Sequence, residues 1–285
     1  MLSLRPPLAP LANAGQAERA PFLAEISFSL VAAYDRLRLS LYRDKGAVGH
    51  LISLASIGSL TLLRFEDVGY FNRVYAHGDD AAHRLASVES FFKGSPHGCR
   101  LVTPHSSASG SLARACTSRG WLPDEEYAWL AASNLSLHPS ALGDFEIRPP
   151  RLDERELFLD SYLAGFGADP SRRPTAIENM RHLFSVPDLH FLFALQDGRP
   201  AGVGMMHRTG RSALLCAGAT LPSYGRQGCH EALLTARIRL ARDLGCTGVY
   251  SWASAGGQSQ ANMESVGLRT VSTTRAWRFP PDPVA

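Results

Sequence analysis

One stretch, from Thr220 to Gly245, constrains the fold of this chain more than any other. It reads TLPSYGRQGCHEALLTARIRLARDLG, which is the end of an apolar strand, a turn with Pro and Gly, and then a helix. After Gly228, small or apolar residues recur at helical spacing, namely Leu233, Ala236, Leu240, Ala241 and Leu244. Gly245 ends the pattern, because glycine readily adopts the left-handed conformation that follows a helix. The sequence therefore predicts a strand, a glycine turn and a helix in succession.

The N-terminus of such a helix favours an anion. Its first amide groups have no partner within the helix, and the helix dipole is positive there. Gly228 allows close approach of the backbone to a ligand, and Arg226 and His230 can add charge or hydrogen-bond donors. A phosphate group is one predicted ligand. An ordinary strand-to-helix turn is the simpler interpretation, and the turn by itself does not decide between them.

The remainder of the second half gives this turn a context. Strands are expected at 144–150, 189–196, 201–208, 212–220, 248–253 and 271–279, where apolar residues are bounded by turn residues. Helices are expected at 155–166 and from Ser259 onward. The predicted order places the glycine turn between two strands near the centre of this half.

This order of elements resembles the acyl-CoA-binding core of the GNAT superfamily of N-acetyltransferases. The pyrophosphate signature of that family is Gln or Arg, two variable residues, Gly, one variable residue, and Gly or Ala. Gly228 fits the central position, whereas Gly225 and His230 occupy the outer two. Ala-Leu-Leu at 232–234, Gly-Cys at 245–246 and the tail at 259–268 are similar to a bacterial two-part GNAT subfamily, in which a bulky polar residue commonly replaces the last glycine. The resemblance covers residues 145–279 well and the first half more loosely.

A chain of 285 residues is long for one such core, so two packed units are expected. The predicted fold class is α/β, a mixed sheet in tandem GNAT-like halves, with the acyl-CoA-binding core in the C-terminal half. Both halves end with a helix, a glycine and a Trp-containing strand, at 109–132 and 259–279. The expected division is a disordered leader at 1–17, a degenerate GNAT-like domain at 18–133, a linker at 134–143 and an acetyltransferase domain at 144–280.

The first half is expected to begin with a helix from Glu18 to about Tyr42. Six apolar residues keep helical spacing there: Phe22, Ile26, Leu30, Ala33, Leu37 and Leu41. A later helix starts at Asp79 or Asp80, but no glycine-rich turn precedes it, so this half is expected to have lost its cofactor turn. The alternative is that any two α/β domains in one chain would show such similarities.

Composition narrows the classes of function. Five cysteines without C-x-x-C spacing favour a reduced compartment and disfavour a disulfide framework or a zinc site, so no metal is expected. The net charge is +3, with no basic run, so nucleic-acid binding is not indicated. No long apolar run predicts a membrane span, and the Pro-containing start is unlike a secretory signal. A cytoplasmic protein without a membrane partner is expected.

The resemblance implies acetyl-CoA as a co-substrate. In the family, the strand before the phosphate turn separates from its neighbour, and its backbone binds the pantetheine arm. That strand end is Gly218, Ala219 and Thr220 here, although small residues also occur in tightly packed strands. The pyrophosphate is then expected against the turn and the start of the helix, at Gly225, Arg226, Gln227, Gly228, Cys229, His230 and Glu231.

The catalytic residues stay open. The family commonly has a Tyr four residues before the glycine that ends the second short helix, but Met263 stands there and cannot protonate the leaving thiolate. The weak candidates for an acid or a base are Ser259, Asn262, His190, His207 and Glu178. Ser259 and Asn262 are equally suited to capping a helix. An acyl-enzyme on Cys216 or Cys229 is disfavoured, because apolar neighbours raise a thiol pKa.

The leading hypothesis is an acyl-CoA-dependent N-acyltransferase that transfers an acetyl group directly to an amine of a small molecule. A non-catalytic acyl-CoA-binding or structural relative is one alternative. A CoA-independent enzyme that uses aminoacyl-tRNA is another, which the missing basic patch disfavours. Segments 65–71 and 121–129 of the first half are expected to line the acceptor pocket. The whole chain is expected to bind one acetyl-CoA. A homodimer is one assembly to consider.

Overall fold

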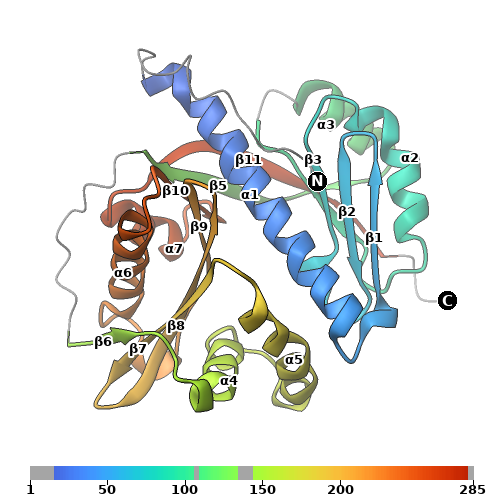
Figure 1. Cartoon of the computed structure of the whole chain (residues 1–285). Coiled ribbons are helices and arrows are strands. Elements are labelled where there is room, and N and C mark those ends of the chain that lie inside the picture. The colour runs from blue at the N-terminus through green and yellow to red at the C-terminus, as the bar shows by residue number, and fades with distance from the viewer. Residues whose placement is uncertain (1–15, 106–108, 134–143, 282–285) are drawn as a thin grey trace.

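A continuous mixed β-sheet runs through the protein (Figure 1). In the computed structural model, which describes residues 16–105, 109–133 and 144–281, the sheet has 11 strands in the order β1-β2-β3-β4-β11-β5-β10-β9-β8-β7-β6. The expected leader lies outside these residues except for Gln16 and Ala17, which begin a helix, and the expected linker at 134–143 lies wholly outside them. The predicted mixed α/β class is confirmed.

We call the described residues up to 133 the N-terminal half and residues 144–281 the C-terminal half. The N-terminal half contains α1 (Gln16–Lys45), β1 (Ile52–Ile57), β2 (Leu60–Phe65), β3 (Arg73–Ala76), α2 (Ala81–Phe92), β4 (Cys99–Val102), α3 (Ser109–Ser118) and β5 (Leu122–Ala132). The C-terminal half contains β6 (Glu146–Arg148), α4 (Arg155–Gly165), α5 (Arg173–Met180), β7 (Leu189–Gln196), β8 (Arg199–Thr209), β9 (Ser212–Thr220), α6 (Cys229–Asp243), β10 (Gly248–Ser254), α7 (Gln258–Ser265) and β11 (Arg269–Phe279). Helix α5 was not predicted from the sequence.

The two halves repeat one order of elements. In the N-terminal half three antiparallel strands, β1 to β3, lead through α2 to β4, which is parallel to β3. In the C-terminal half β7 to β9 lead in the same way through α6 to β10, which is parallel to β9. A further helix and a final strand follow in each half. The expected tandem arrangement is thereby confirmed.

The halves exchange their final strands. Strand β5 of the N-terminal half lies between β11 and β10, while β11 of the C-terminal half lies between β4 and β5. β5 pairs with β10 from Tyr127–Ser254 to Ala132–Val249, and β11 pairs with β4 around Trp277–Leu101. Each half therefore supplies a central strand to the sheet of the other, which was not predicted from the sequence.

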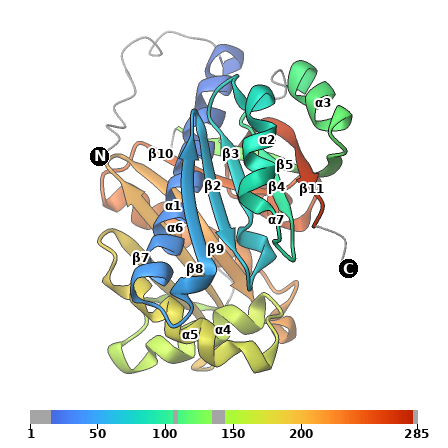
Figure 2. The ribbon, with the colours of Figure 1, turned by 90° about the vertical axis from the view of Figure 1, so that its right-hand side faces the viewer.

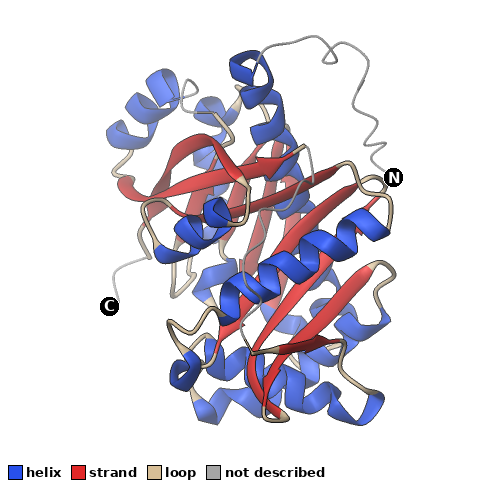
Figure 3. Ribbon diagram, turned by 90° about the vertical axis from the view of Figure 1, so that its left-hand side faces the viewer, coloured by secondary structure: helices blue, strands red, loops and turns tan. Residues whose placement is uncertain are grey.

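Helices cover both faces of the sheet (Figures 2 and 3). On one face, which we call the α6 face, residues of α2 and α3 share one apolar cluster, and residues of α6 and α7 share another. On the opposite face, the α1 face, residues of α1 and α4 and the end of α5 join a single larger cluster with both halves of the sheet. No helix of the described residues is long and apolar enough to cross a membrane.

Helix α1 crosses the middle of the sheet (Figure 1). The ring of Phe28 packs edge-on against Tyr75 of β3 and Trp129 of β5, and Ser27 donates a hydrogen bond to the Ser251 carbonyl of β10 at 2.8 Å. The expected helix is present, but of the six apolar residues that indicated it, Leu30 alone is buried, while Ile26 and Leu41 pack against the core at its edge. The buried positions of α1 are Ala24, Ser27, Phe28, Leu30, Val31, Ala32, Tyr34, Asp35, Arg38, Leu39 and Tyr42. Of the buried polar residues, Ser27 and Asp35 have hydrogen-bond partners on other elements, whereas Arg38 packs against the ring of Phe71.

Asn72 fixes the start of β3. Its Oδ1 accepts the N–H of Phe65 at 2.7 Å, and its Nδ2 donates to Ser95 Oγ and to the Gly98 carbonyl, both at 3.0 Å. Asn72 is buried, and these bonds join β2, β3 and the segment before β4. The backbone of the next residue, Arg73, is consequently held in place.

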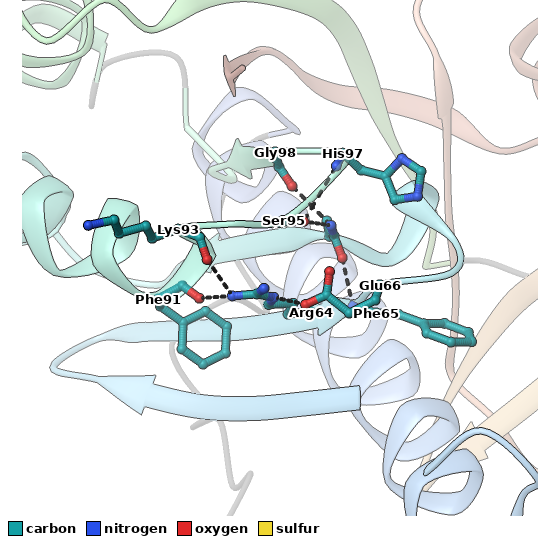
Figure 4. Close-up of polar contacts among 9 residues, drawn as sticks. Arg64, Phe65, Glu66, Phe91, Lys93, Ser95, His97 and Gly98 are labelled. Carbon is teal, nitrogen blue, oxygen red and sulfur yellow. Dashed lines mark hydrogen bonds and ion pairs between the residues drawn. The ribbon is translucent and has the colours of Figure 1, made fainter. Parts of the chain in front are cut away.

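Arg64 closes the end of α2 beside this junction. Its guanidinium donates to the carbonyl oxygens of Phe91 and Lys93 at 2.6 and 3.2 Å, and it pairs with Glu66, as Figure 4 shows. The last carbonyls of a helix have no partner within it, and a cation there also interacts favourably with the helix dipole. Arg64 thus satisfies the C-terminus of α2 and ties it to β2.

Candidate functional site

Strands β9 and β10 separate along their length. They are parallel neighbours, yet the residue pairs that join them are only Gly248–Ser212, Val249–Ala213 and Tyr250–Leu214. At the end of this ladder, Ser251 Oγ donates to the Leu215 carbonyl at 3.0 Å. From Cys216 to Thr220, the β10 side of β9 has no strand partner. Its backbone groups are therefore open to an extended ligand, and the expected separation is present.

A β-bulge lies in this open part of β9. Gly204 of β8 pairs with Gly218 and Met205 pairs with Cys216, so Ala217 is the extra residue. Ala217 has a φ of 51°, a value unusual for a residue other than glycine. A bulge re-aims side chains, and here both Cys216 and Ala217 pack on the α1 face. The bulge thus turns unpaired backbone toward the opening between β9 and β10.

The turn after β9 ends at a helix N-terminus that no side chain covers. Gly228 precedes α6 with a φ of 83°, and no side chain caps the helix. A side chain at Gly228 would meet no atom within 4 Å, so the space in front of these amides is open. Arg226 lies exposed beside it with a φ of 60°. Free amides, open space and a nearby cation together suit an anion such as a phosphate.

His230 lies behind this turn as a neutral side chain. Burial, and then the nearby Arg237, lower its pKa to about 4. Asn262 of α7 fits its surroundings when its side-chain oxygen accepts the Nδ1–H of His230 at 2.9 Å and its nitrogen donates to Glu231 Oε1 at 3.1 Å. His230 therefore brings no positive charge to a phosphate at neutral pH, and its Nδ1–H is already used.

Arg237 of α6 lies beneath the bulge. It is 1% exposed, and it donates to the carbonyls of Leu233 at 3.0 Å and Met205 at 3.2 Å. Burial lowers its pKa to about 10, so it stays charged at pH 7. A side chain on Gly218 would come within 3.1 Å of Arg237 Nη2 and 3.4 Å of His230 Nε2. The absence of a side chain at Gly218 thus leaves room for these two side chains beneath the strand.

The candidate catalytic residues of α7 do not form a group. Ser259 is exposed, while Asn262 is buried against His230. Met263 packs in the apolar cluster between α7 and the sheet, together with Leu234 and Leu268. Asn262 is therefore a support of the turn, and Met263 a core residue.

The other candidates lie away from the turn. His190 lies near the start of β7, where it pairs with Met206 of β8. His207 lies near the end of β8, where it pairs with Leu214 of β9. Burial lowers the pKa of both imidazoles. Glu178 is on the outer helix α5, paired with Arg181. The fold thus brings 218–220, 225–231 and Asn262 together at one end of β9 and leaves these three residues elsewhere.

The cysteine side chains are poor nucleophiles. All five are free and buried. Burial raises the pKa of both Cys216 and Cys229 to about 11. Within the described residues, no group of three or more His, Cys, Asp or Glu side chains could hold a metal ion.

Sequence reasoning missed a polar group on the α1 face. On α1, Asp35 accepts the hydroxyl of Tyr75, and Arg38 lies over the ring of Phe71. Beside them, Arg73 of β3 lies over the rings of Tyr127 of β5 and Trp252 of β10. The signal for it was present, because polar and tyrosine side chains at 34, 35, 38 and 42 recur at helical spacing. The apolar residues at helical spacing on the same helix gave a stronger signal than these polar residues.

Comparisons with known proteins agree on one family. Residues 153–267 match the sequence model of the Acetyltransferase (GNAT) family. No curated protein matches the chain by sequence. A GCN5-related N-acetyltransferase from Sphaerobacter thermophilus is similar in structure, with a TM-score of 0.59, 17% identity, and coverage of 94% of this chain and 95% of that one.

Two further solved structures are similar over comparable lengths. A GCN5-related N-acetyltransferase from Kribbella flavida has a TM-score of 0.58 and 15% identity, over 88% of this chain and 96% of that one. A tandem GNAT protein from the clavulanic acid biosynthesis pathway has a TM-score of 0.55 and 10% identity, over 88% of this chain and 97% of that one. At such identities these likenesses show the fold, including its tandem form.

Proposed function

Because residues 153–267 match the sequence model of the Acetyltransferase (GNAT) family, we propose that this protein is an acyl-CoA-dependent N-acyltransferase. It transfers an acetyl group from acetyl-CoA directly to an amine of a small molecule. The observation that carries this proposal is the opening between β9 and β10, which ends at the uncapped N-terminus of α6. An unpaired strand edge suits an amide-containing arm, and the free helix amides suit its phosphates.

The residues of the opening are proposed to bind the co-substrate in order. Gly218, Ala219 and Thr220 offer backbone groups to the pantetheine arm. The segment from Gly225 to Glu231 offers its amides to the pyrophosphate, with Arg226 as the charged side chain. His230, Asn262 and Arg237 hold this segment from behind.

Direct transfer fits the chemistry of the side chains. The amine attacks the thioester carbon, the C–S bond breaks, and the amine gives up a proton as the thiolate leaves. A thiol has a pKa of about 8.5, so its thiolate leaves near neutral pH without a dedicated acid. An acyl-enzyme is disfavoured because the raised pKa values of Cys216 and Cys229 keep both thiols protonated. The base that deprotonates the amine is not assigned.

The two halves are proposed to bind different substrates. The segment 144–280 binds acetyl-CoA, and the segment 18–133 contributes to the acceptor site on the α1 face, where α1, β3 and β5 meet β10. We propose these segments as repeats with different tasks. A cytoplasmic location and a homodimeric assembly stay predictions.

Binding of acetyl-CoA tests the proposal. A ligand that binds only the folded protein stabilises it by about 2.7 kcal/mol at a concentration about a hundred times its Kd, so thermal unfolding should shift upward. Gly228→Asp should abolish the shift, because a carboxylate beside a phosphate is repulsive. Gly210→Asp is the matched control, since Gly210 also has a positive φ and open space around it, but lies in the turn between β8 and β9.

Three outcomes separate the alternatives. A shift that Gly228→Asp removes and Gly210→Asp keeps supports binding at the α6 turn. No shift for the unaltered protein in millimolar acetyl-CoA contradicts the proposal. Binding without CoA release, with any amine offered, indicates instead a non-catalytic acyl-CoA-binding protein.

A further inference from the structure

Two arginines are buried on the α1 face without an acidic partner. Arg38 of α1 is 6% exposed and Arg73 of β3 is 1% exposed. The ion pairs of the described residues include neither of them. Arg38 Nε is buried and has no hydrogen-bond partner among those residues. A guanidinium is always charged, and a buried charge without a counter-charge is costly.

Aromatic rings surround both guanidinium groups. Arg38 lies over Phe71 at 4.9 Å, Tyr34 at 5.4 Å and Tyr42 at 6.0 Å from the ring centroids. Rings hold a cation by attraction to their faces, but they carry no negative charge. These contacts therefore position the cation and leave it uncompensated.

Arg73 has the same kind of surroundings. It lies over Tyr70 and Trp252, both at 4.7 Å, and over Tyr127 at 5.4 Å. Its Nε donates to the Tyr70 carbonyl at 3.1 Å and its Nη1 to Tyr127 Oη at 3.4 Å. We call Arg38, Arg73 and the side chains around them the Arg–Tyr cluster.

The buried part of the Arg–Tyr cluster has a net positive formal charge. Its buried carboxylate is Asp35, which accepts the hydroxyl of Tyr75 at 2.6 Å, while the exposed Glu125 accepts the hydroxyl of Tyr127 at the edge of the cluster. Burial raises the pKa of the surrounding tyrosines Tyr34, Tyr42, Tyr70, Tyr75 and Tyr127, which stay neutral. Burial also keeps Cys216 protonated and His207 neutral by shifting the pKa of each. The two buried guanidinium groups and the one buried carboxylate thus leave one positive charge in the interior.

This charge lies beside the opening between β9 and β10. Tyr34, next to Arg38, donates to Met205 Sδ at 3.7 Å, and Met205 pairs with Cys216 at the bulge of β9. Trp252, next to Arg73, is on β10 beyond its last pair with β9. The Arg–Tyr cluster therefore lies next to the bulge of β9 on one side and includes a residue of β10 on the other.

Tyr70 lies where the cluster meets the surface. It is 48% exposed, and it covers the guanidinium of Arg73 at 4.7 Å. Trp252, on the other side of Arg73, is also partly exposed. A small ligand can therefore approach Arg73 between these two rings with a rotation of Tyr70.

We propose that the acceptor amine also carries a carboxylate, as an amino acid does, and that the Arg–Tyr cluster binds this carboxylate. The inference rests on the proposed function and names its substrate class. A guanidinium binds a carboxylate through two parallel hydrogen bonds, and a single negative charge matches the charge of the cluster. With the carboxylate there, the amine of a small amino acid faces the opening where the thioester is proposed to lie.

A purely structural role makes opposite predictions. If Arg38 served only to join α1 to the sheet, then its replacement by Met would destabilise the fold. If Arg38 awaits an anion, an apolar side chain of similar length removes an uncompensated buried charge, and the protein melts at the same or a higher temperature.

The test uses the full chain, Arg38→Met, and Arg36→Met as a control on the exposed side of the same helix. The probes are the L-amino acids at millimolar concentration and, for each, the amide that lacks the carboxylate. We expect at least one amino acid, and not its amide, to raise the melting temperature of the unaltered protein and of Arg36→Met. Arg38→Met should lose this shift and keep the shift with acetyl-CoA. With acetyl-CoA present, kcat/KM for that amino acid should exceed the value for its amide by about a hundredfold or more.

The failures of the two proposals are distinguishable. If acetyl-CoA gives no shift, the proposed function fails whatever the amino acids do. If acetyl-CoA binds but amides act as well as acids, or no amino acid shifts the melting temperature, the carboxylate inference is wrong. A lowered melting temperature of Arg38→Met, with acid-dependent shifts intact, also overturns it and assigns Arg38 to structure.

Discussion

The opening between β9 and β10 has a counterpart in the N-terminal half. Strands β3 and β4 are likewise parallel and joined by the pairs Arg73–Arg100, Val74–Leu101 and Tyr75–Val102. A helix, α2, begins beyond the end of β3, as α6 does beyond β9. A cavity of about 340 Å³ lies there, lined by residues that include His77, Asp79, Thr103 and His105. The cavity thus lies at the point of the N-terminal half that corresponds to the start of α6 in the C-terminal half.

The two halves differ here in charge and in strand length. Glycine precedes α6, whereas Asp79 and Asp80 precede α2. Asp80 bonds Ser59 and Arg84, and these bonds lower its pKa to about 2. Strand β3 ends at Ala76, directly after its ladder with β4. The three residue pairs of this ladder contain no bulge. The same frame therefore carries an uncapped helix start after glycine in one half and carboxylates at the helix start in the other. In our proposal the turn, rather than the fold, selects the ligand.

Separating the halves should have the largest effect. A shortened chain that begins near Ser140 loses β5 from beside β10, and β11 loses both of its neighbours. Exposed strand edges and an open core follow, so we expect no cooperative unfolding transition from this shortened chain. Producing the two segments together as separate chains should restore a complex that unfolds cooperatively. A lone C-terminal half that is soluble and melts cooperatively would show that the exchange of strands is dispensable.

The number of bound acetyl-CoA molecules is the next test of the comparison. We expect calorimetric titration to saturate at one equivalent per chain, because two carboxylates at the start of α2 repel a pyrophosphate. A value near two would show that the N-terminal cavity also binds the co-substrate. Should that occur, Gly228→Asp would reduce the value to one and identify the remaining site as the N-terminal one.

The two helix N-termini should also differ in their pH dependence. Folding lowers the pKa of His230 from its ordinary 6.5 to about 4, so the unfolded chain takes up a proton first as the pH falls. The free energy of unfolding therefore declines between pH 6.5 and pH 4, by up to about 3 kcal/mol at about 1.4 kcal/mol per pKa unit. For Asp80, the folded pKa is lowered from 3.8 to about 2, so its stabilisation is present above pH 3.8 and lost toward pH 2.

Matched variants separate these two windows. Denaturant unfolding at several pH values should show a flatter decline between pH 6.5 and pH 4 for His230→Gln than for the unaltered protein. For Asp80→Asn, the decline in the free energy of unfolding should be flatter than that of the unaltered protein only below pH 3.8. Equal slopes for His230→Gln and the unaltered protein would mean that His230 is solvated in the folded state.

Local features of the C-terminal half could be predicted from the sequence. Strand β9 has the expected bounds, and α6 begins after Gly228 as the apolar spacing indicated. Both features depend on residues close together in the chain, so a pattern of a few residues carries the information. The exchange of β5 and β11 could not be predicted in this way. It joins residues far apart in the chain, such as Trp129 and Trp252, and a strand sequence does not identify its partner.

The α1 face shows a second limit. Apolar spacing at Ala33 and Leu37 indicated the helix, whereas the residues that the fold buries beside them are Asp35 and Arg38. Hydrophobic periodicity finds the face that packs when the interior is apolar. It fails where the interior is a polar site, because the partners that make burial of Arg38 tolerable come from distant segments, such as Phe71. The polar group that binds the acceptor in our proposal is thus the part of the molecule that could not be predicted from the sequence.

The smallest effect is expected at Met263, which occupies the same position in its half as Cys116 does in the other. Met263 and Cys116 both stand four residues before the glycine that ends their helix, and each backbone carbonyl accepts the N–H of the residue after that glycine. Both side chains are buried in the apolar clusters of the α6 face. Met263→Leu conserves volume and removes no proton donor, so we expect a stability change under about 1.5 kcal/mol and turnover within a few-fold of the unaltered enzyme. A loss of about a hundredfold in kcat, with acetyl-CoA binding and the melting temperature unchanged, is the scale of a lost acid or base and would assign α7 a part in the reaction that α3 does not share.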